Sequence, residues 1–166
     1  IEPAELGHVN AGATGSPEDD AVEARAIQQA LGSAASAVPV TALAGYLGHS
    51  DAGGGAVELA GCLLSLRHRL VPHTLGFRTA DSGCRLDIVE GASRPITGRL
   101  AISCNRTEFG QSAAVGVRAE HMQRPAPSLR GWRPAPEAAL GVFRKRVVAS
   151  VSVLPSPAAV AAAAPP

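Results

Sequence analysis

The chain has 166 residues, of which 46% are apolar, 17% charged and only 3% aromatic. This length fits one globular domain and is too short for two of ordinary size. No uninterrupted apolar run approaches the ~18 to 20 residues that a membrane-spanning helix needs, so we expect no membrane span. The first five residues lack a basic region followed by an apolar core, so we also expect no signal peptide.

The formal net charge is +1, but the charges are unevenly distributed. Residues 1–40 hold six acids and one base, a net charge of −5, whereas residues 120–166 hold six bases and two acids, a net charge of +4. Only one Trp and one Phe lie among the C-terminal bases. We therefore expect a solvated tail rather than a surface that binds nucleic acid.

Three cysteines are scattered through the chain, at positions 62, 84 and 104. Their odd number and wide spacing fit neither a disulfide framework nor a zinc site. We therefore expect no metal site and a reducing compartment, which means the cytoplasm.

The N-terminal region begins with a strand pattern followed by a helix pattern. Residues 6–11 form a short apolar run, which is typical of the end of a buried strand. Ser16 and Pro17, followed by three acids, predict the start of a helix. Apolar residues at helical spacing extend this helix over residues 17–31, and Gly32 ends it.

The middle of the chain repeats this alternation and then gives paired strands. A second helix over residues 54–66 is apolar on most faces, so we expect it to be buried rather than to lie on the surface. The other expected elements are a strand at 38–42, a loop at 44–53, an extended connector at 70–77, and strands at 86–89, 100–104 and 113–117. This order predicts an α/β fold, a layered mixed sheet with a buried central helix.

The sequence changes character after Arg118. Prolines recur through residues 119–166, and residues 158–164 are almost all alanine. Residues 146–154 fit one further strand, but the stretch cannot bury a core of its own. We therefore predict a folded domain over residues 1–118 and a Pro-, Ala- and Arg-rich extension over residues 119–166 that is disordered or loosely docked.

Three motifs follow one another over about residues 7–118. They are VNAGATGSP at 9–17, followed by Asp20 and Glu23; PVT at 39–41, continued by Gly48-His49, GAVEL at 55–59 and VPHTL at 71–75; and CRLDIV at 84–89, followed by FGQS at 109–112. Together they resemble the C-terminal part of the β-ketoacyl synthases, the condensing enzymes of fatty-acid and polyketide synthesis. The resemblance implies a thiolase-like half-domain. The family's first half, which carries the nucleophilic cysteine, is absent from this sequence.

The resemblance implies roles for four positions near the reacting atoms. His49 lies at the second of the family's two active-site histidines, and Glu58 lies at the partner of the family's lysine. Gly12 stands at the first histidine position and Ala44 at the lysine position, so both family side chains are lost. No lysine occurs before Lys145 that could replace the partner of Glu58. The cysteines offer no substitute nucleophile.

Positions for binding the acyl carrier are better retained. Thr14 and Ser16 match the two threonines that hydrogen-bond the phosphopantetheine arm in the family, although Ser16 has an equally good explanation as a helix cap. Phe109 aligns with the family's gating phenylalanine, in a turn where Gln111 replaces a glycine.

The resemblance therefore implies a protein related to decarboxylative Claisen condensation of acyl and malonyl thioesters, but inactive as this chain alone. Its substrates would be phosphopantetheine-linked acyl groups, and no other cofactor is expected. Expected partners are an acyl carrier protein and either a complementary N-terminal half or an intact ketosynthase, in a homo- or hetero-oligomer. Two alternatives stay open: a non-catalytic partner subunit like the chain-length factors, and a binding or scaffold module.

Overall fold

The structure is a computed structural model that describes residues 1–48, 50–107, 109–119 and 150–153. In this part of the chain the helices are α1 (Pro17–Leu31), α2 (Ala44–Leu47) and α3 (Gly54–His68), with 3-10 turns at Pro3–Glu5, Gly32–Ala34 and Asp51–Gly53. The strands are β1 (Leu6–Asn10), β2 (Pro39–Thr41), β3 (Leu70–Val71), β4 (Asp87–Ile88), β5 (Arg94–Pro95), β6 (Leu100–Arg106), β7 (Ser112–Arg118) and β8 (Ser150–Val153).

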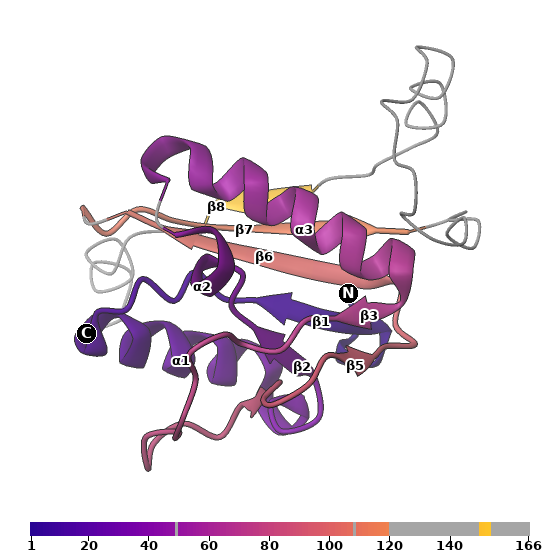
Figure 1. The fold of residues 1–166 in the computed structure, drawn as a ribbon, viewed down its shortest axis with the longest axis horizontal. Coiled ribbons are helices and arrows are strands. Elements are labelled where there is room, and N and C mark those ends of the chain that lie inside the picture. The colour runs from indigo at the N-terminus through magenta and orange to yellow at the C-terminus, as the bar shows by residue number, and fades with distance from the viewer. Residues whose placement is uncertain (49, 108, 120–149, 154–166) are drawn as a thin grey trace, which may run out of the picture.

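A mixed six-stranded sheet organises the molecule, in the order β4-β2-β1-β6-β7-β8 (Figure 1). The strands β4, β2, β1 and β6 are parallel, whereas β7 and β8 run antiparallel to their neighbours. A small antiparallel pair, β3 and β5, lies outside this sheet. The predicted layered mixed sheet is therefore confirmed.

The first helix follows the signals in its sequence. The Ser16 hydroxyl accepts a hydrogen bond from the Asp19 amide (3.4 Å), Pro17 occupies the first turn, and Gly32 caps the C-terminus with a φ of 56°. By contrast, α2 lies in the stretch predicted as a loop. It is a single turn closed by bonds from Tyr46 and Leu47 to the Leu43 carbonyl, too short to produce a periodic pattern.

The strand β8 falls within the predicted extension. Its register with β7 runs from Ala113 opposite Val153 to Gly116 opposite Ser150, so these four residues extend the sheet at one edge. This agrees with the strand pattern noted in that region. The remaining residues of 120–166 lie outside the described residues, and the division of the chain at 118/119 stays a prediction.

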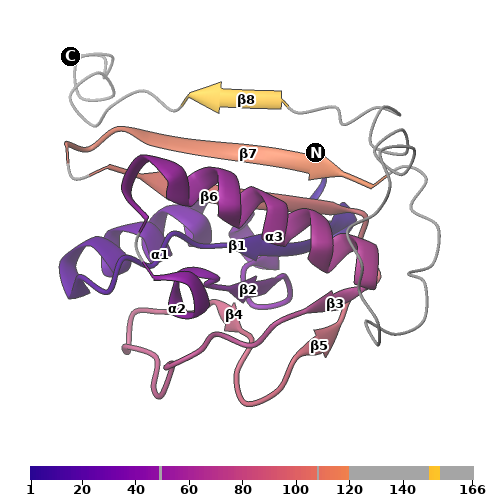
Figure 2. The same ribbon diagram turned by 45° about the horizontal axis from the view of Figure 1, so that its top comes forward.

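The sheet separates two apolar cores (Figure 2). The core under α1 contains Val9, Ile27, Leu31 and Val40. The core under α3 contains Cys62, Leu66 and Val71, together with Ala101 and Val117 of the neighbouring strands β6 and β7. The strand β1 lies between the two cores and is buried at all five positions, two of which, His8 and Asn10, are polar.

The helix α3 is buried on one face only. The face toward the sheet consists of Glu58, Cys62, Ser65 and Leu66, all less than 9% exposed. On other faces, the side chains of Val57 and Leu64 are 47% and 53% exposed. The helix expected to be buried is thus buried on the face toward the sheet, and the described residues cover no second face of it. No helix among them is long and apolar enough to cross a membrane.

One polar contact connects α3 to the middle of the sheet. The Asn10 side chain is fully buried at the end of β1, and its amide nitrogen donates to Glu58 Oε2 of α3 over 2.9 Å. The Asn10 carbonyl oxygen accepts a 2.9 Å bond from the Leu43 amide, directly before α2. One side chain thus joins β1, α3 and the start of α2 in a site without water access.

A second buried polar side chain on β1 has no such partner. His8 pairs with Ala101, a member of the α3-side core, and is 0% exposed. Neither of its ring nitrogens hydrogen-bonds with the described residues. Burial lowers the pKa of His8 from the usual 6.5 to about 4, because the charged ring would lose its hydration.

The His8 pKa predicts a loss of stability in mild acid. As the pH falls from 6.5 toward 4, the unfolded chain binds a proton that the folded chain does not, so the free energy of unfolding falls by on the order of 3 kcal/mol. We expect His8→Leu to remove this part of the loss, and the exposed His68→Leu to retain it. Urea unfolding at pH 7 and pH 4.5 gives the free energy of unfolding of each variant. If His8→Leu loses as much of this free energy between the two pH values as the unmodified chain does, the assignment is contradicted.

Removing the Asn10 contact should be costly. We expect Asn10→Ala to lower the free energy of unfolding by about 3 kcal/mol, because two buried hydrogen bonds lose a partner at once. Asn10→Asp should be worse at pH 7, since it places a second carboxylate beside Glu58, and should recover in acid. Asn105→Ala is the matched control, because the Asn105 side chain forms no hydrogen bond within the described residues. Denaturant titration compares the three variants.

Candidate functional site

The predicted site residues gather where the parallel strands end. Because β1, β2 and β6 run in the same direction, the segments that follow them meet at one edge of the sheet. These segments are the loop 11–16 after β1, the turn into α2 after β2, and the turn 107–111 between β6 and β7. The Glu58 carboxylate reaches the same edge through its bond to Asn10.

A half-buried carboxylate, that of Glu23, holds the loop after β1. Glu23 Oε1 accepts from the Gly12 amide (2.8 Å) and Glu23 Oε2 accepts from the Ala13 amide (2.9 Å). Ala13 has a φ of 39°, in the left-handed region that non-glycine residues rarely adopt. Burial raises the pKa of Glu23, and the two amide donors oppose that rise. Glu23 therefore stabilises a strained loop conformation from the helix that follows it.

At Gly12, the first lost family position, the surroundings are closely packed. A β-carbon there would lie 3.3 Å from Glu23 Oε1 and 3.5 Å from the Cys104 carbonyl oxygen. A larger side chain at this position thus requires Glu23 to move slightly. That a family histidine is lost at this position stays a prediction. Gly12 itself has no side chain that could take over its role.

The two hydroxyl residues predicted to bind phosphopantetheine lie on the same loop. The exposed Thr14 hydroxyl is 3.5 Å from Asp20 Oδ1, and its oxygen is 3.5 Å from the Ser16 amide. Ser16 caps α1, as its alternative explanation required. Capping uses the Ser16 oxygen as an acceptor and leaves its proton able to donate, so it does not decide between the two roles.

Four other predicted positions lie at this edge or beside it in the chain. Glu58 is 8% exposed, and Ala44 is the first residue of α2. His49 lies outside the described residues, so its predicted role stays a prediction. Phe109 is 84% exposed at the tip of the β6–β7 turn. That turn is closed by bonds between Thr107 and Gln111, in the backbone (2.8 Å) and between the side chains (2.9 Å).

Cys62 and Cys104 are not suited to nucleophilic attack. Burial raises the pKa of both Cys62 and Cys104 from 9 to about 12, so both are thiols at neutral pH. Cys62 is 0% exposed in the α3-side core, which agrees with its expected role as a small apolar side chain. The described residues contain no cluster of three potential metal ligands.

Two positioning residues were not identified from the sequence, although both lie in the first motif. The sequence assigns Asn10 and Glu23 no role beyond their place in that motif, next to residues with assigned roles. Their functions depend on contacts with residues 48 and 11 positions away, respectively. A buried Asn at the end of an apolar strand was the available signal, because such a side chain needs partners.

Comparison with known proteins agrees with this arrangement. Residues 1–78 match the family described as β-ketoacyl synthase, C-terminal domain. The 3-oxoacyl-(acyl-carrier-protein) synthase 2 of Mycobacterium tuberculosis is 42% identical over 110 residues, which is 66% of this chain and 26% of that protein. The actinorhodin polyketide putative β-ketoacyl synthase 1 of Streptomyces coelicolor is 35% identical over 113 residues, 67% of this chain and 24% of that protein.

Solved structures give the same fold. The ishigamide ketosynthase/chain length factor matches with a TM-score of 0.58 and 28% identity, over 63% of this chain and 25% of its own. A β-ketoacyl synthase from Burkholderia phymatum matches with a TM-score of 0.68 and 24% identity, over 73% of this chain and 29% of its own. The chain spans about a quarter of the length of the curated relatives it matches. Over the matched residues this chain is similar to the C-terminal segment of the β-ketoacyl synthases, and it has their thiolase-like fold.

Proposed function

We propose that this chain is a β-ketoacyl-synthase-like component of fatty-acid or polyketide synthesis that contributes one wall of the acyl-carrier site and does not condense substrates alone. The observation that carries the proposal is the edge of the sheet where Glu23 holds the 11–16 loop and Asn10 holds Glu58. This edge is organised in detail, yet positions 12 and 44 hold Gly and Ala.

The chemistry explains why such an edge is insufficient by itself. Condensation needs a thiolate that accepts the acyl group, and preorganised donors for the negative charge that develops on the thioester oxygen. With a pKa of about 12, Cys62 and Cys104 hold only about one thiolate per 10⁵ thiols at pH 7. Neither of these two thiols is therefore suited to accept the acyl group, and under this proposal the nucleophile is supplied by another chain.

The substrate class follows from the hydroxyl groups and the relatives. Thr14 and Ser16 would hydrogen-bond a phosphopantetheine arm that carries the acyl group, without a further cofactor. The curated relatives include synthases named for their acyl-carrier-protein substrates, which supports an acyl carrier protein as partner. With these substrates, we propose that the protein acts in the cytoplasm.

A second candidate is a non-catalytic partner of the chain-length-factor kind. Two observations favour it: Gly12 and Ala44 remove two polar side chains that the catalytic members use, and one of the similar structures is named as a ketosynthase/chain length factor. Under this alternative Thr14 and Phe109 would still face an acyl chain, but the reacting thioester would lie on the partner.

Carrier binding tests the proposal. We expect the chain to bind phosphopantetheinylated acyl carrier protein more tightly than the carrier without its arm, and Thr14→Val to lower that affinity about tenfold, since one hydroxyl hydrogen bond is lost. Thr97→Val is the matched control, because Thr97 is exposed on a different loop. Biolayer interferometry measures all of these affinities.

The same preparation should release no carbon dioxide from malonyl-carrier protein, while an intact synthase does so under the same conditions. Turnover by this chain would overturn the role given to Gly12 and Ala44. Equal affinity for the carrier with and without its arm would overturn the binding assignment.

The exposed face of α3 predicts how the chain associates. We expect the purified chain to form oligomers, and to become a one-to-one complex when co-expressed with the N-terminal half of a related synthase, because Val57 and Leu64 expose apolar surface. Leu64→Asp should abolish that complex. Gln29→Asp, which places the same charge at an exposed position of α1, should not. Light scattering after gel filtration measures the masses; a stable monomer of the unmodified chain contradicts the prediction.

A further inference from the structure

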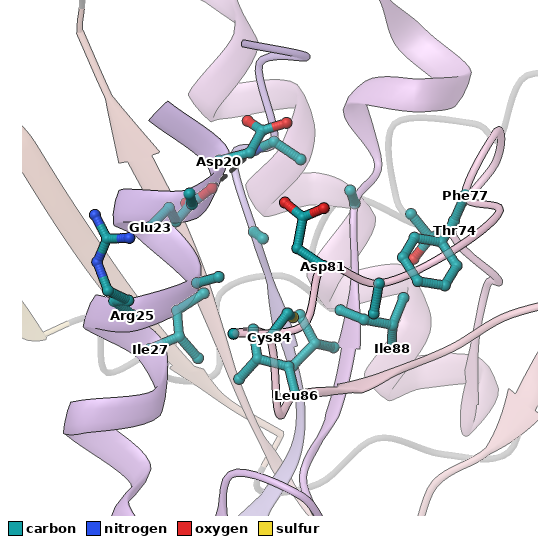
Figure 3. Close-up of a pocket in the computed structure, with 18 of the residues that line it drawn as sticks. Asp20, Glu23, Arg25, Ile27, Thr74, Phe77, Asp81, Cys84, Leu86 and Ile88 are labelled. Carbon is teal, nitrogen blue, oxygen red and sulfur yellow. Dashed lines mark hydrogen bonds between the residues drawn. The ribbon is translucent and has the colours of Figure 1, made fainter. Parts of the chain in front are cut away.

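A cavity lies on the face of the sheet that carries α1, beside the loop after β1. Its volume is about 630 Å³, within the range of small-molecule sites. It is bounded by α1, by β2 and β4, and by the segment 74–86, which crosses in front of them (Figure 3). Thr14, Ser16, Glu58 and Phe109 are not among its lining residues. The cavity adjoins the carrier site through Ala11, Ala13 and Glu23, but the four residues predicted to act there do not line it.

The floor of the cavity is apolar. It consists of Ile27 from α1, Val40 from β2, and Leu86 and Ile88 from the chain around β4. Ile27 and Val40 belong to the α1-side core, and Leu86 and Ile88 pack against it. Ile27 and Val40 are already buried, whereas Leu86 and Ile88 are half-buried, so an apolar group in the cavity would extend an existing core and cover the exposed parts of these two side chains.

The outer wall of the cavity is loosely attached. Residues 78–83 are all exposed, and the backbone bond that closes this stretch joins the Cys84 amide to the Asp81 carbonyl (2.9 Å). The wall is held near its two ends, by the bond from the Thr74 amide to the Val89 carbonyl (2.7 Å) and by the bond from the Arg85 amide to the Gln28 side chain. The segment therefore spans the space in front of α1 without filling it.

The polar groups of the cavity are mainly acidic. Asp20, Glu23 and Asp81 line it, against a single base, Arg25. Both Glu23 oxygens accept bonds from the loop after β1, whereas the Asp81 carboxylate has no hydrogen bond or ion pair within the described residues. In Figure 3 the carboxyl group of Asp81 projects from the wall toward α1, which carries the other two acids.

One further polar group in the cavity lacks a partner. The Thr74 hydroxyl is shielded from solvent and forms no hydrogen bond with the described residues. A shielded hydroxyl without a partner is unfavourable, so this atom is suited to bind a ligand group or a water molecule.

From these features we propose that the cavity binds a small apolar molecule that carries a protonated amine. The apolar part would contact Ile27, Leu86 and Ile88, and the ammonium group would donate to the Asp81 carboxylate and the Thr74 hydroxyl. A neutral apolar ligand would leave both groups without partners, and an anion would be repelled by the three acids. The proposal does not depend on the function proposed above.

Three probes of similar shape test this proposal on the full chain: 3-phenylpropylamine, 3-phenylpropan-1-ol and 3-phenylpropionate. We expect the amine to bind at least about tenfold more tightly than the alcohol, and the carboxylate not to bind, because a charge-assisted hydrogen bond exceeds a neutral one. Chemical-shift perturbation in NMR spectra gives both the affinity and the residues affected, which should line the cavity.

Two variants separate a site from general attraction between charges. Asp81→Asn, at an exposed position that tolerates the change, should weaken amine binding about tenfold and leave alcohol binding unchanged. Glu18→Gln removes an equally exposed acid of α1 that does not line the cavity, and should change nothing. Equal binding of amine and alcohol, an equal effect of Glu18→Gln, or no perturbation of the lining residues would each overturn the proposal, the last leaving a cavity that holds only water.

Discussion

The arrangement of the functional edge depends on the side chain of Asn10. An amide is suited to this place because it donates to one group and accepts from another, and here it does both within 2.9 Å. Its partners lie on different layers, Glu58 on the helix and Leu43 at the start of α2. Any displacement of α3 along the sheet would break a buried hydrogen bond, so the contact fixes the helix in position as well as in depth.

Glu23 acts similarly on the other face of the sheet. Its carboxylate accepts hydrogen bonds from the Gly12 and Ala13 amides and so stabilises the left-handed conformation of Ala13. The edge is thus held by Asn10 from the side of α3 and by Glu23 from the side of α1. The precision of this arrangement contrasts with the absence of polar side chains at positions 12 and 44, and that contrast underlies the proposed supporting role.

Local signals predicted the longer elements well. The Ser16 cap, Pro17 and Gly32 set both ends of α1, and the apolar runs placed β1, β6 and β7, because these patterns report backbone preference and burial directly. The family resemblance identified Thr14, Ser16 and Glu58 as site residues, and in the structure they lie at one edge of the sheet.

Features that depend on distant neighbours were not predictable. The one-turn helix α2 is closed by carbonyl groups rather than by a pattern of side chains. An apolar helix such as α3 has the same sequence whether one face or all faces are covered, so exposure of Leu64 depends on how many layers surround it. The His8 pKa and the cavity behind residues 74–86 likewise depend on the path of other segments.

The pairing of β8 with β7 has a consequence for insertions and deletions in this chain. β7 ends at Arg118, and β8 begins at Ser150, opposite Gly116. The two attachment points of the intervening residues therefore lie at the same end of the sheet. When the ends of a connection are neighbours, doubling its length adds only about 0.6 kcal/mol of closure entropy. Insertions and deletions between these strands should accordingly be among the mildest changes that this gene can undergo, whereas a single-residue shift within 112–118 would move every side chain of β7 to the opposite face.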